Sequence, residues 1–160
     1  MSSKSAAGRA SKELLLDVLQ LVLDKSRIDP ALAKKLRYAR TKGYVRREGI
    51  SHLLTQKGRE MLSENKIWEL SVPRPRRWDG KWHFVLFDIP ADKRKRRDIF
   101  RTRLKEMGLT LYQNSVWVYP YPLEKEVREI AVFYKLSPCV SFITAEEITG
   151  EAGLIQLYEL

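Results

Sequence analysis

Four apolar, strand-like segments and two segments of helical periodicity restrict the folds open to the second half of this 160-residue chain. Strands are expected near residues 81–88, twice within 109–121 and at 139–143, and helices near 92–107, with Asp92 as N-cap, and 123–135. The order strand, helix, strand, strand, helix, strand predicts a ferredoxin-like domain. The short apolar segment Gly153–Tyr158 predicts a fifth strand, either at the sheet edge or in a partner's sheet.

The first half has a different pattern, which predicts a small helical domain with one hairpin. Helices are expected from an N-cap at Ser11 to about Asp24, from Asp29-Pro30 to Gly43, and onward from a cap at Thr55, with two short strands around Gly49. The first helix is apolar on most of its circumference, so it needs a core or a second chain to cover it. The second helix is rich in lysine and arginine.

Charge divides the chain at the same place as the pattern does. Residues 1–77 contain 18 Lys+Arg and 8 Asp+Glu, whereas residues 78–160 contain 12 of each, so the whole net charge of +10 lies in the first part. A basic half joined to a neutral half favours a polyanion as partner of the basic half. With two prolines, three arginines and no periodicity, residues 71–77 predict a linker. The expected segments are a disordered tail at 1–10, a basic domain at 11–70, the linker at 71–77 and the ferredoxin-like domain at 78–160.

Composition also excludes several classes of protein. The single cysteine, Cys139, rules out an internal disulfide framework and a cysteine-rich zinc site. The two histidines, His52 and His83, are too far apart in the chain to form a local metal motif. The longest apolar run, Leu14–Leu23, is far shorter than the roughly 20 residues of a membrane span. We therefore expect a cytoplasmic protein that binds no membrane.

The order of elements in the basic half resembles a winged helix-turn-helix domain. The helix, basic helix, "KGYVRRE", hairpin and "LTQKGREML" carry the resemblance, which extends from Ser11 to about Leu70. In that family the basic helix enters the major groove of DNA and the hairpin wing touches the backbone. The expected DNA contacts are Lys34, Lys35, Arg46 and Arg47 on phosphates, with Tyr38 and Lys42 near the groove. One departure is that only about eighteen residues separate the first helix from the wing, too few for a full helix-turn-helix, so a role in dimerisation stays open.

The run Lys93–Arg97 is a second basic feature, and it lies in the otherwise neutral half. It places five cations in the first turn of a predicted helix, where the macrodipole favours anions. A phosphate at this terminus would turn the electrostatic cost into a binding site, with Arg94 and Arg97 as the candidate ligands. The alternative is a solvated helix without a ligand.

The stretch "WHFVLFDIPADKRKRRDIFRTRLKEMGLTLYQNSVWVYPYP" resembles the central domain of PaaX-type transcriptional repressors. That domain is in turn similar to the small CRISPR-associated endonuclease of spacer acquisition. The resemblance spans Trp78–Leu160 and implies a ferredoxin-like homodimer, in which the last strand often pairs across the interface. In the endonucleases two symmetry-related aspartates hold a divalent metal near the dimer axis. Asp88 is the matching position, and Phe87 stands where these enzymes usually have tyrosine.

These features favour a dimeric, double-stranded-DNA-binding transcriptional regulator over an enzyme. The reason is that a basic winged domain supplies a separate DNA-binding surface, which a small nuclease does not need. In a regulator no cofactor is expected, and Asp88 is a helix cap or a partner of Arg97. The alternative is an endonuclease or a related protein of CRISPR adaptation, with Mg²⁺ or Mn²⁺ on Asp88, support from Ser115 and a CRISPR integrase as partner. A third class is a scaffold whose basic half binds RNA or another polyanion.

Overall fold

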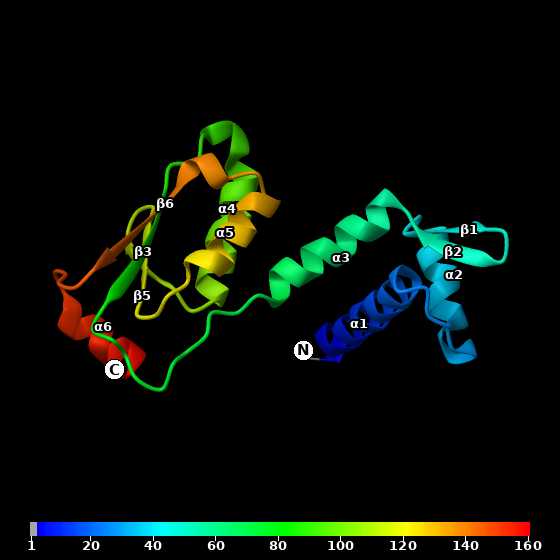
Figure 1. Cartoon of the computed structure of the whole chain (residues 1–160), viewed down its shortest axis with the longest axis horizontal. Helices are drawn as coiled ribbons and strands as arrows, with labels where there is room; N and C mark the ends of the chain where they lie inside the picture. Colours follow the sequence, from blue (N-terminus) through cyan, green and yellow to red (C-terminus); the bar gives the residue numbers. More distant parts are fainter. Residues whose placement is uncertain (1–2) are drawn as a thin grey trace. The chain divides into compact units, whose positions relative to one another are not determined.

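The computed structural model describes residues 3–160, with side chains from residue 13 onward, and it divides into two compact units after Lys66. Figure 1 shows the order of elements along the chain. Among the helices described, none is long and apolar enough to cross a membrane.

The first unit packs three helices around a two-stranded hairpin. Its elements are α1 (Ser3–Leu23), η1 (Pro30–Leu32), α2 (Ala33–Thr41), β1 (Val45–Glu48), β2 (Ser51–Leu54) and the first part of α3 (Gln56–Glu69). Two of the predicted caps are present, since Asp29 Oδ1 accepts a hydrogen bond from Ala31 N at 2.7 Å and Thr55 Oγ1 accepts one from Gly58 N at 3.2 Å. The apolar side of α1 packs against Ala39, Val45 and Leu54, and this contact forms the core of the unit.

The start of α1 differs from the prediction. A disordered tail was expected at 1–10 with an N-cap at Ser11, but α1 begins at Ser3, so residues 3–10 are helical and Ser11 lies inside the helix. This part of the prediction is wrong. The segment contains Ala6, Ala7 and Ala10, and alanine has the highest intrinsic helix propensity. Residues 1–2 lie outside the described part.

The second unit has the predicted order of strands and helices. Its elements are β3 (Trp82–Phe87), η2 (Ala91–Lys93), α4 (Arg94–Glu106), β4 (Thr110–Gln113), β5 (Val116–Tyr119), α5 (Glu124–Phe133), η3 (Ser137–Cys139), β6 (Val140–Ala145) and α6 (Glu151–Tyr158). The strands form one antiparallel sheet in the order β4-β5-β3-β6. The β-α-β-β-α-β order expected of a ferredoxin-like domain is thus confirmed.

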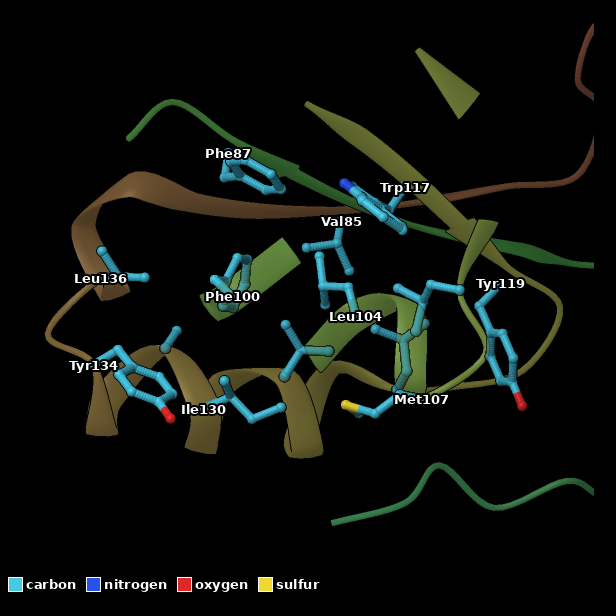
Figure 2. Close-up of a cluster of buried hydrophobic side chains, with 14 of the residues drawn as sticks. Val85, Phe87, Phe100, Leu104, Met107, Trp117, Tyr119, Ile130, Tyr134 and Leu136 are labelled. Carbon is cyan, nitrogen blue, oxygen red and sulfur yellow. The ribbon is translucent and has the colours of Figure 1, made fainter. Parts of the chain in front are cut away.

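Each face of this sheet has its own apolar cluster, because successive side chains of a strand point to opposite faces. Val85 and Phe87 of β3 point to the face that α4 and α5 cover, and Figure 2 shows them opposite Phe100 and Leu104 of α4. The rings of Phe87 and Phe100 meet edge to face, with centroids 5.3 Å apart. Trp82 of β3 points to the other face, where it packs with residues of α6.

The predicted fifth strand is wrong, because residues 151–158 form α6. As a helix this segment places Leu154, Ile155 and Tyr158 on one side, where they pack against the cluster around Trp82. The Tyr158 hydroxyl lies 2.8 Å from Thr110 Oγ1 and 3.0 Å from the carbonyl oxygens of two further residues, Gly108 and Val118. The segment therefore covers its own sheet and adds no strand to it.

Residues 71–77 have no regular secondary structure, but they pack on the second unit. Val72 is buried in the cluster that α4 and α5 cover. The Arg74 Nε donates a hydrogen bond of 3.1 Å to the Tyr119 hydroxyl. The boundary between the two compact units lies before this segment, after Lys66 and therefore within α3.

Candidate functional site

The exposed side of α2 carries a row of cations in the first unit. Lys34, Tyr38 and Lys42 follow one another at intervals of four residues, so they lie along one side of the helix. The Lys42 Nζ lies 5.7 Å from the centre of the Tyr38 ring. Lys35 is half-buried, and Ala39, about 100° around the helix from Tyr38, is completely buried. The sequence of α2 contains no acidic residue that would neutralise this row.

The hairpin formed by β1 and β2 carries the other two predicted cations. Arg46 and Arg47 are both exposed, and as neighbours on a strand they point to opposite faces of the hairpin. The Arg46 guanidinium lies 3.8 Å from the Glu48 carboxylate, and Arg47 Nε donates a hydrogen bond of 2.8 Å to the Gly49 carbonyl. We call α2 and this hairpin the basic face, comprising Lys34, Lys35, Arg37, Tyr38, Arg40, Lys42, Arg46 and Arg47.

Contacts at the base of the hairpin hold it against the end of α2. The Thr55 backbone N–H donates to the Tyr44 carbonyl at 3.0 Å, which closes the hairpin. The Lys57 Nζ donates to the Lys42 carbonyl at 2.8 Å and lies 4.7 Å from the centre of the Tyr44 ring. These bonds join the start of α3 to both parts of the basic face, so they fix the position of the hairpin relative to α2.

Two cations of the basic face were not predicted from the sequence. Arg37 and Arg40 are exposed on α2, as Lys34 and Lys42 are. A helical projection would have identified Arg37, because it lies almost opposite the buried Ala39, whereas Arg40 directly follows Ala39 and gives no such signal.

In the second unit, Asp88 lies directly after β3 and its side chain is exposed. Its backbone N–H donates to the Cys139 carbonyl at 3.0 Å, and the preceding Phe87 N–H donates to the Ser115 carbonyl at 3.1 Å. The structure therefore brings Asp88 and Ser115 to the same end of the sheet, as the nuclease hypothesis requires. No hydrogen bond or ion pair of the Asp88 side chain is present within the described part of the chain.

The expectation that Asp88 is a cap or a partner of Arg97 is wrong. The short helix η2 starts after Pro90, and α4 starts after Lys93 without a side-chain cap, so neither Asp88 nor the predicted Asp92 has that role. Arg97 lies beside Asp98 instead, with its Nε 4.0 Å from the carboxylate. Because η2 precedes it, α4 begins at Arg94, one residue later than a helix capped by Asp92 would begin.

The two candidate phosphate ligands, Arg94 and Arg97, both lie next to Asp98. The Arg94 Nε is 3.9 Å from its carboxylate, and the Arg94 side chain is 78% exposed. Lys95 and Arg96 between them are exposed. One carboxylate thus faces two of the cations, and the first turn of α4 keeps an excess of positive charge. No ion pair joins this run to Asp88 among the residues described.

One chain offers a poor site for a divalent metal at the end of β3. Mg²⁺ prefers several oxygen ligands, and Asp88 supplies a single carboxylate. The described residues contain no group of three or more His, Cys, Asp or Glu side chains that could hold a metal ion. Within one chain the residues therefore do not fit the metal site of the endonucleases, and a second Asp88 would have to come from another copy.

The comparisons with known proteins agree with the architecture of the second unit. The family model described as the PaaX protein central Cas2-like domain matches residues 75–154, which is half of the chain. This range includes all four strands of the sheet, Asp88, Ser115 and the basic run. No curated protein matches the chain. On this match the chain belongs to the PaaX family, and its second unit is the Cas2-like central domain of that family.

Proposed function

We propose that the protein is a dimeric transcriptional regulator of PaaX type that binds double-stranded DNA through the basic face of its first unit. In this proposal α2 lies in the major groove, the hairpin is a wing on the phosphate backbone, and the Cas2-like unit supplies the dimer interface. The observation that carries the proposal is the pair of exposed lysines on either side of Tyr38 along α2, Lys34 and Lys42, beside a cationic hairpin that Lys57 and Thr55 hold against the end of α2.

The dimensions of α2 agree with this role. Nine residues at a rise of about 1.5 Å give a helix about 13 Å long, and the major groove is about 12 Å wide. Lys34 and Lys42 at its two ends suit the phosphates on either side, while Tyr38 lies between them and faces the bases. Phosphate contacts supply affinity, and base contacts supply specificity.

Salt dependence tests the DNA-binding proposal. If a dimer neutralises roughly 6 to 10 phosphates, affinity for duplex DNA falls by about 10³ to 10⁵ between 50 and 200 mM salt. Changing Arg46 and Arg47 together to Ala should weaken binding to every sequence and flatten this slope. In the matched control, Lys125 and Arg128 on α5 are changed to Ala. This change should alter neither the affinity for DNA nor the slope of affinity against salt. Binding that ignores salt, or that survives the Arg46/Arg47 change, overturns the proposal.

A partly uncovered sheet face supports the dimer. On the side of the sheet where α6 packs, Leu86 and Val116 are half-buried and Ile143 is 52% exposed. The three belong to neighbouring strands β3, β5 and β6, and the strand register places them on one face. Asp88 directly follows β3, at the same end of the sheet as Leu86 and Val116. A second copy packed on this face would bury the three apolar side chains beside Asp88.

A metal-dependent endonuclease is the second candidate function, and the exposed, unpaired Asp88 side chain favours it. In this hypothesis two Asp88 carboxylates from a dimer hold Mg²⁺ or Mn²⁺ and Ser115 supports the site, while Arg94 and Arg97 bind phosphate. A bound divalent metal lowers the pKa of a water ligand, which can then attack a phosphate.

Two assays on the same DNA separate the candidates. Cleavage of linear duplex DNA is measured with Mn²⁺, and binding is measured with EDTA, for the wild type, Asp88→Asn and the control Asp79→Asn. The regulator hypothesis expects binding in EDTA and no cleavage by any of the three. Cleavage by the wild type and by Asp79→Asn, but not by Asp88→Asn with its binding intact, would establish the endonuclease instead.

A further inference from the structure

The tip of the hairpin presents one apolar side chain in a place where hairpins normally have a polar one. Glu48 pairs with Ser51, so Gly49 and Ile50 are the two loop residues. Gly49 has φ +59°, as the first position of a type II′ turn requires. The second position of such loops usually holds Asn, Asp or Ser. Here it holds Ile50, which is 95% exposed, more than any other large hydrophobic side chain in the described residues.

The segments around Ile50 carry more positive than negative charge, with Lys25, Arg27, Arg46 and Arg47 against Asp29 and Glu48. Arg47 is folded back on the tip through its bond to the Gly49 carbonyl, and this contact leaves the terminal guanidinium nitrogens free to bind an anion. Lys25 and Arg27 line the same groove as Ile50, a cavity of about 660 Å³ between the hairpin and the loop that follows α1, together with the carboxylates of Asp29 and Glu48. The only carboxylate of the hairpin, Glu48, is paired with Arg46 at 3.8 Å. The tip therefore combines an apolar point with positive charge on the segments around it.

We propose that Ile50 is a wedge that enters the minor groove of DNA and partly unstacks one base step. Isoleucine is among the residues that minor-groove proteins insert between base pairs, and the insertion kinks the duplex. The minor groove is about 6 Å wide. Two paired strands have axes roughly 4.8 Å apart and are wider than the groove once their own backbone and side chains are added, so only the tip can enter it. Charge complementarity selects DNA as the partner, since the cations around Ile50 match the phosphates that line the groove. This inference rests on the proposed DNA-binding function and adds a contact to it.

A wedge predicts a preference for DNA that unstacks easily. TA steps are flexible, whereas A-tracts are stiff. Two 24-base-pair duplexes of the same composition serve as probes, one with a core of alternating TA steps and one with an A-tract core. A fluorescent donor and acceptor at the two ends report bending, and anisotropy reports affinity. The wild type should bind the TA-step duplex about tenfold more tightly and bring its ends closer together.

The variant Ile50→Asn tests the wedge without disturbing the turn, because Asn is a usual residue at this position. It should lose the preference for TA steps and the bending, with an unchanged salt slope, and Ile50→Leu should keep all three. Val132→Asn removes a similarly exposed apolar side chain from α5 and is the matched control. Equal affinity of wild type and Ile50→Asn for both duplexes, or bending that persists in Ile50→Asn, overturns the inference while DNA binding stands. Absence of binding to either duplex at 50 mM salt overturns the proposed function itself.

Discussion

Arg103 shows what single residues contribute to the second unit and why a sequence conceals it. Its side chain is almost completely buried, with Nη2 donating to the Ile67 and Leu70 carbonyls at 3.1 and 3.0 Å and Nη1 donating to the Glu106 carboxylate at 2.7 Å. It also stacks on Trp68, 4.8 Å from the ring centre. These bonds satisfy carbonyls at the end of α3, which a helix leaves unpaired. The sequence does not distinguish Arg103 from the other cations of α4, because the carbonyl groups that it binds lie more than thirty residues away in the chain.

Asp29 and Thr55 behave differently, because both caps could be read from the sequence. A capping side chain binds a backbone N–H two or three residues away, so the local sequence contains both partners. Asp88 is an intermediate case. Its position after a buried strand follows from periodicity, but the absence of a partner for its carboxylate depends on where η2 and α4 begin. The structure therefore corrects the role expected of Asp88 and leaves its position as predicted.

His83 predicts a pH dependence of stability for the second unit. Its Nε2 is buried without a hydrogen-bond partner, and its Nδ1 lies 3.3 Å from Thr144 Oγ1. Burial lowers the pKa of His83 below its usual value of 6.5, with Asp79 opposing and Lys81 adding to the shift. As the pH falls, the unfolded chain binds this proton before the folded chain does. Protonation of His83 therefore does not reduce the free energy of unfolding of the second unit above about pH 6.5. Below that pH the free energy of unfolding declines as the pH falls towards the pKa of the folded state.

Urea denaturation at pH 7.5 and at pH 5.5 measures this effect. All four tryptophans lie in the second unit, so their fluorescence reports its unfolding alone. In His83→Gln, the loss of stability between the two pH values should be smaller than in the wild type. An equal loss in both proteins would show that His83 does not titrate differently in the folded and unfolded chains.

Among the elements, α6 marks the limit of pattern-based prediction. The other α-helices and strands of the second unit are long enough, or have clear enough ends, for their periodicity to distinguish a helix from a strand. Residues 153–158 form a short apolar run, for which periodicity alone does not separate a strand from a helix. The decision comes from the sheet, because Trp82 and Val118 need a cover, and a helix with Leu154, Ile155 and Tyr158 on one side supplies it. Such tertiary information is absent from the segment itself.

The packing of α3 against the hairpin gives a prediction at the scale of elements. Gly58, the third residue of α3, lies so close to the Tyr44 backbone carbonyl that an added Cβ would overlap it. Gly58→Ala should therefore destabilise the first unit by about 1–3 kcal/mol, as overpacking usually does, despite a gain of roughly 1 kcal/mol in helix propensity. Far-UV circular dichroism in urea reports the unfolding of both units, and tryptophan fluorescence reports that of the second unit. Comparing the two separates the destabilisation of the first unit from any change in the second.

Gly153 provides the matched control, because it is also the third residue of its helix, α6. Apart from its chain neighbours and the backbone of its own helix, no atom of the described residues lies within 4 Å of the position that its Cβ would occupy. Gly153→Ala should leave the stability of the second unit unchanged or raise it by up to about 1 kcal/mol. Equal effects of the two substitutions would contradict the close contact between α3 and the hairpin.

At the scale of the whole molecule, charge and packing assign different roles to the two units. The excess of cations belongs to residues 1–77 and is concentrated on α2 and the hairpin, whereas the Cas2-like unit has a balanced charge and a partly open apolar sheet face. The composition of the sequence predicted this division of charge. The sheet face could not be predicted in the same way, since it depends on α6 covering one end of the sheet and leaving Ile143 exposed at the edge strand.

The open face predicts that the protein is a homodimer, as proposed above. Light scattering at micromolar concentration should give twice the 18.7 kDa mass of one chain. Ile143→Asp places a carboxylate on the open face, at its edge strand β6, and should yield monomers, because burying an unpaired charge costs far more than the apolar contact contributes. Since a monomer neutralises about half as many phosphates, the slope of DNA affinity against salt should fall by about half. Val132→Asp, on α5 and therefore on the other side of the sheet, should remain dimeric with an unchanged slope. A monomeric wild type, or a dimer that survives Ile143→Asp but not Val132→Asp, would move the interface away from this face.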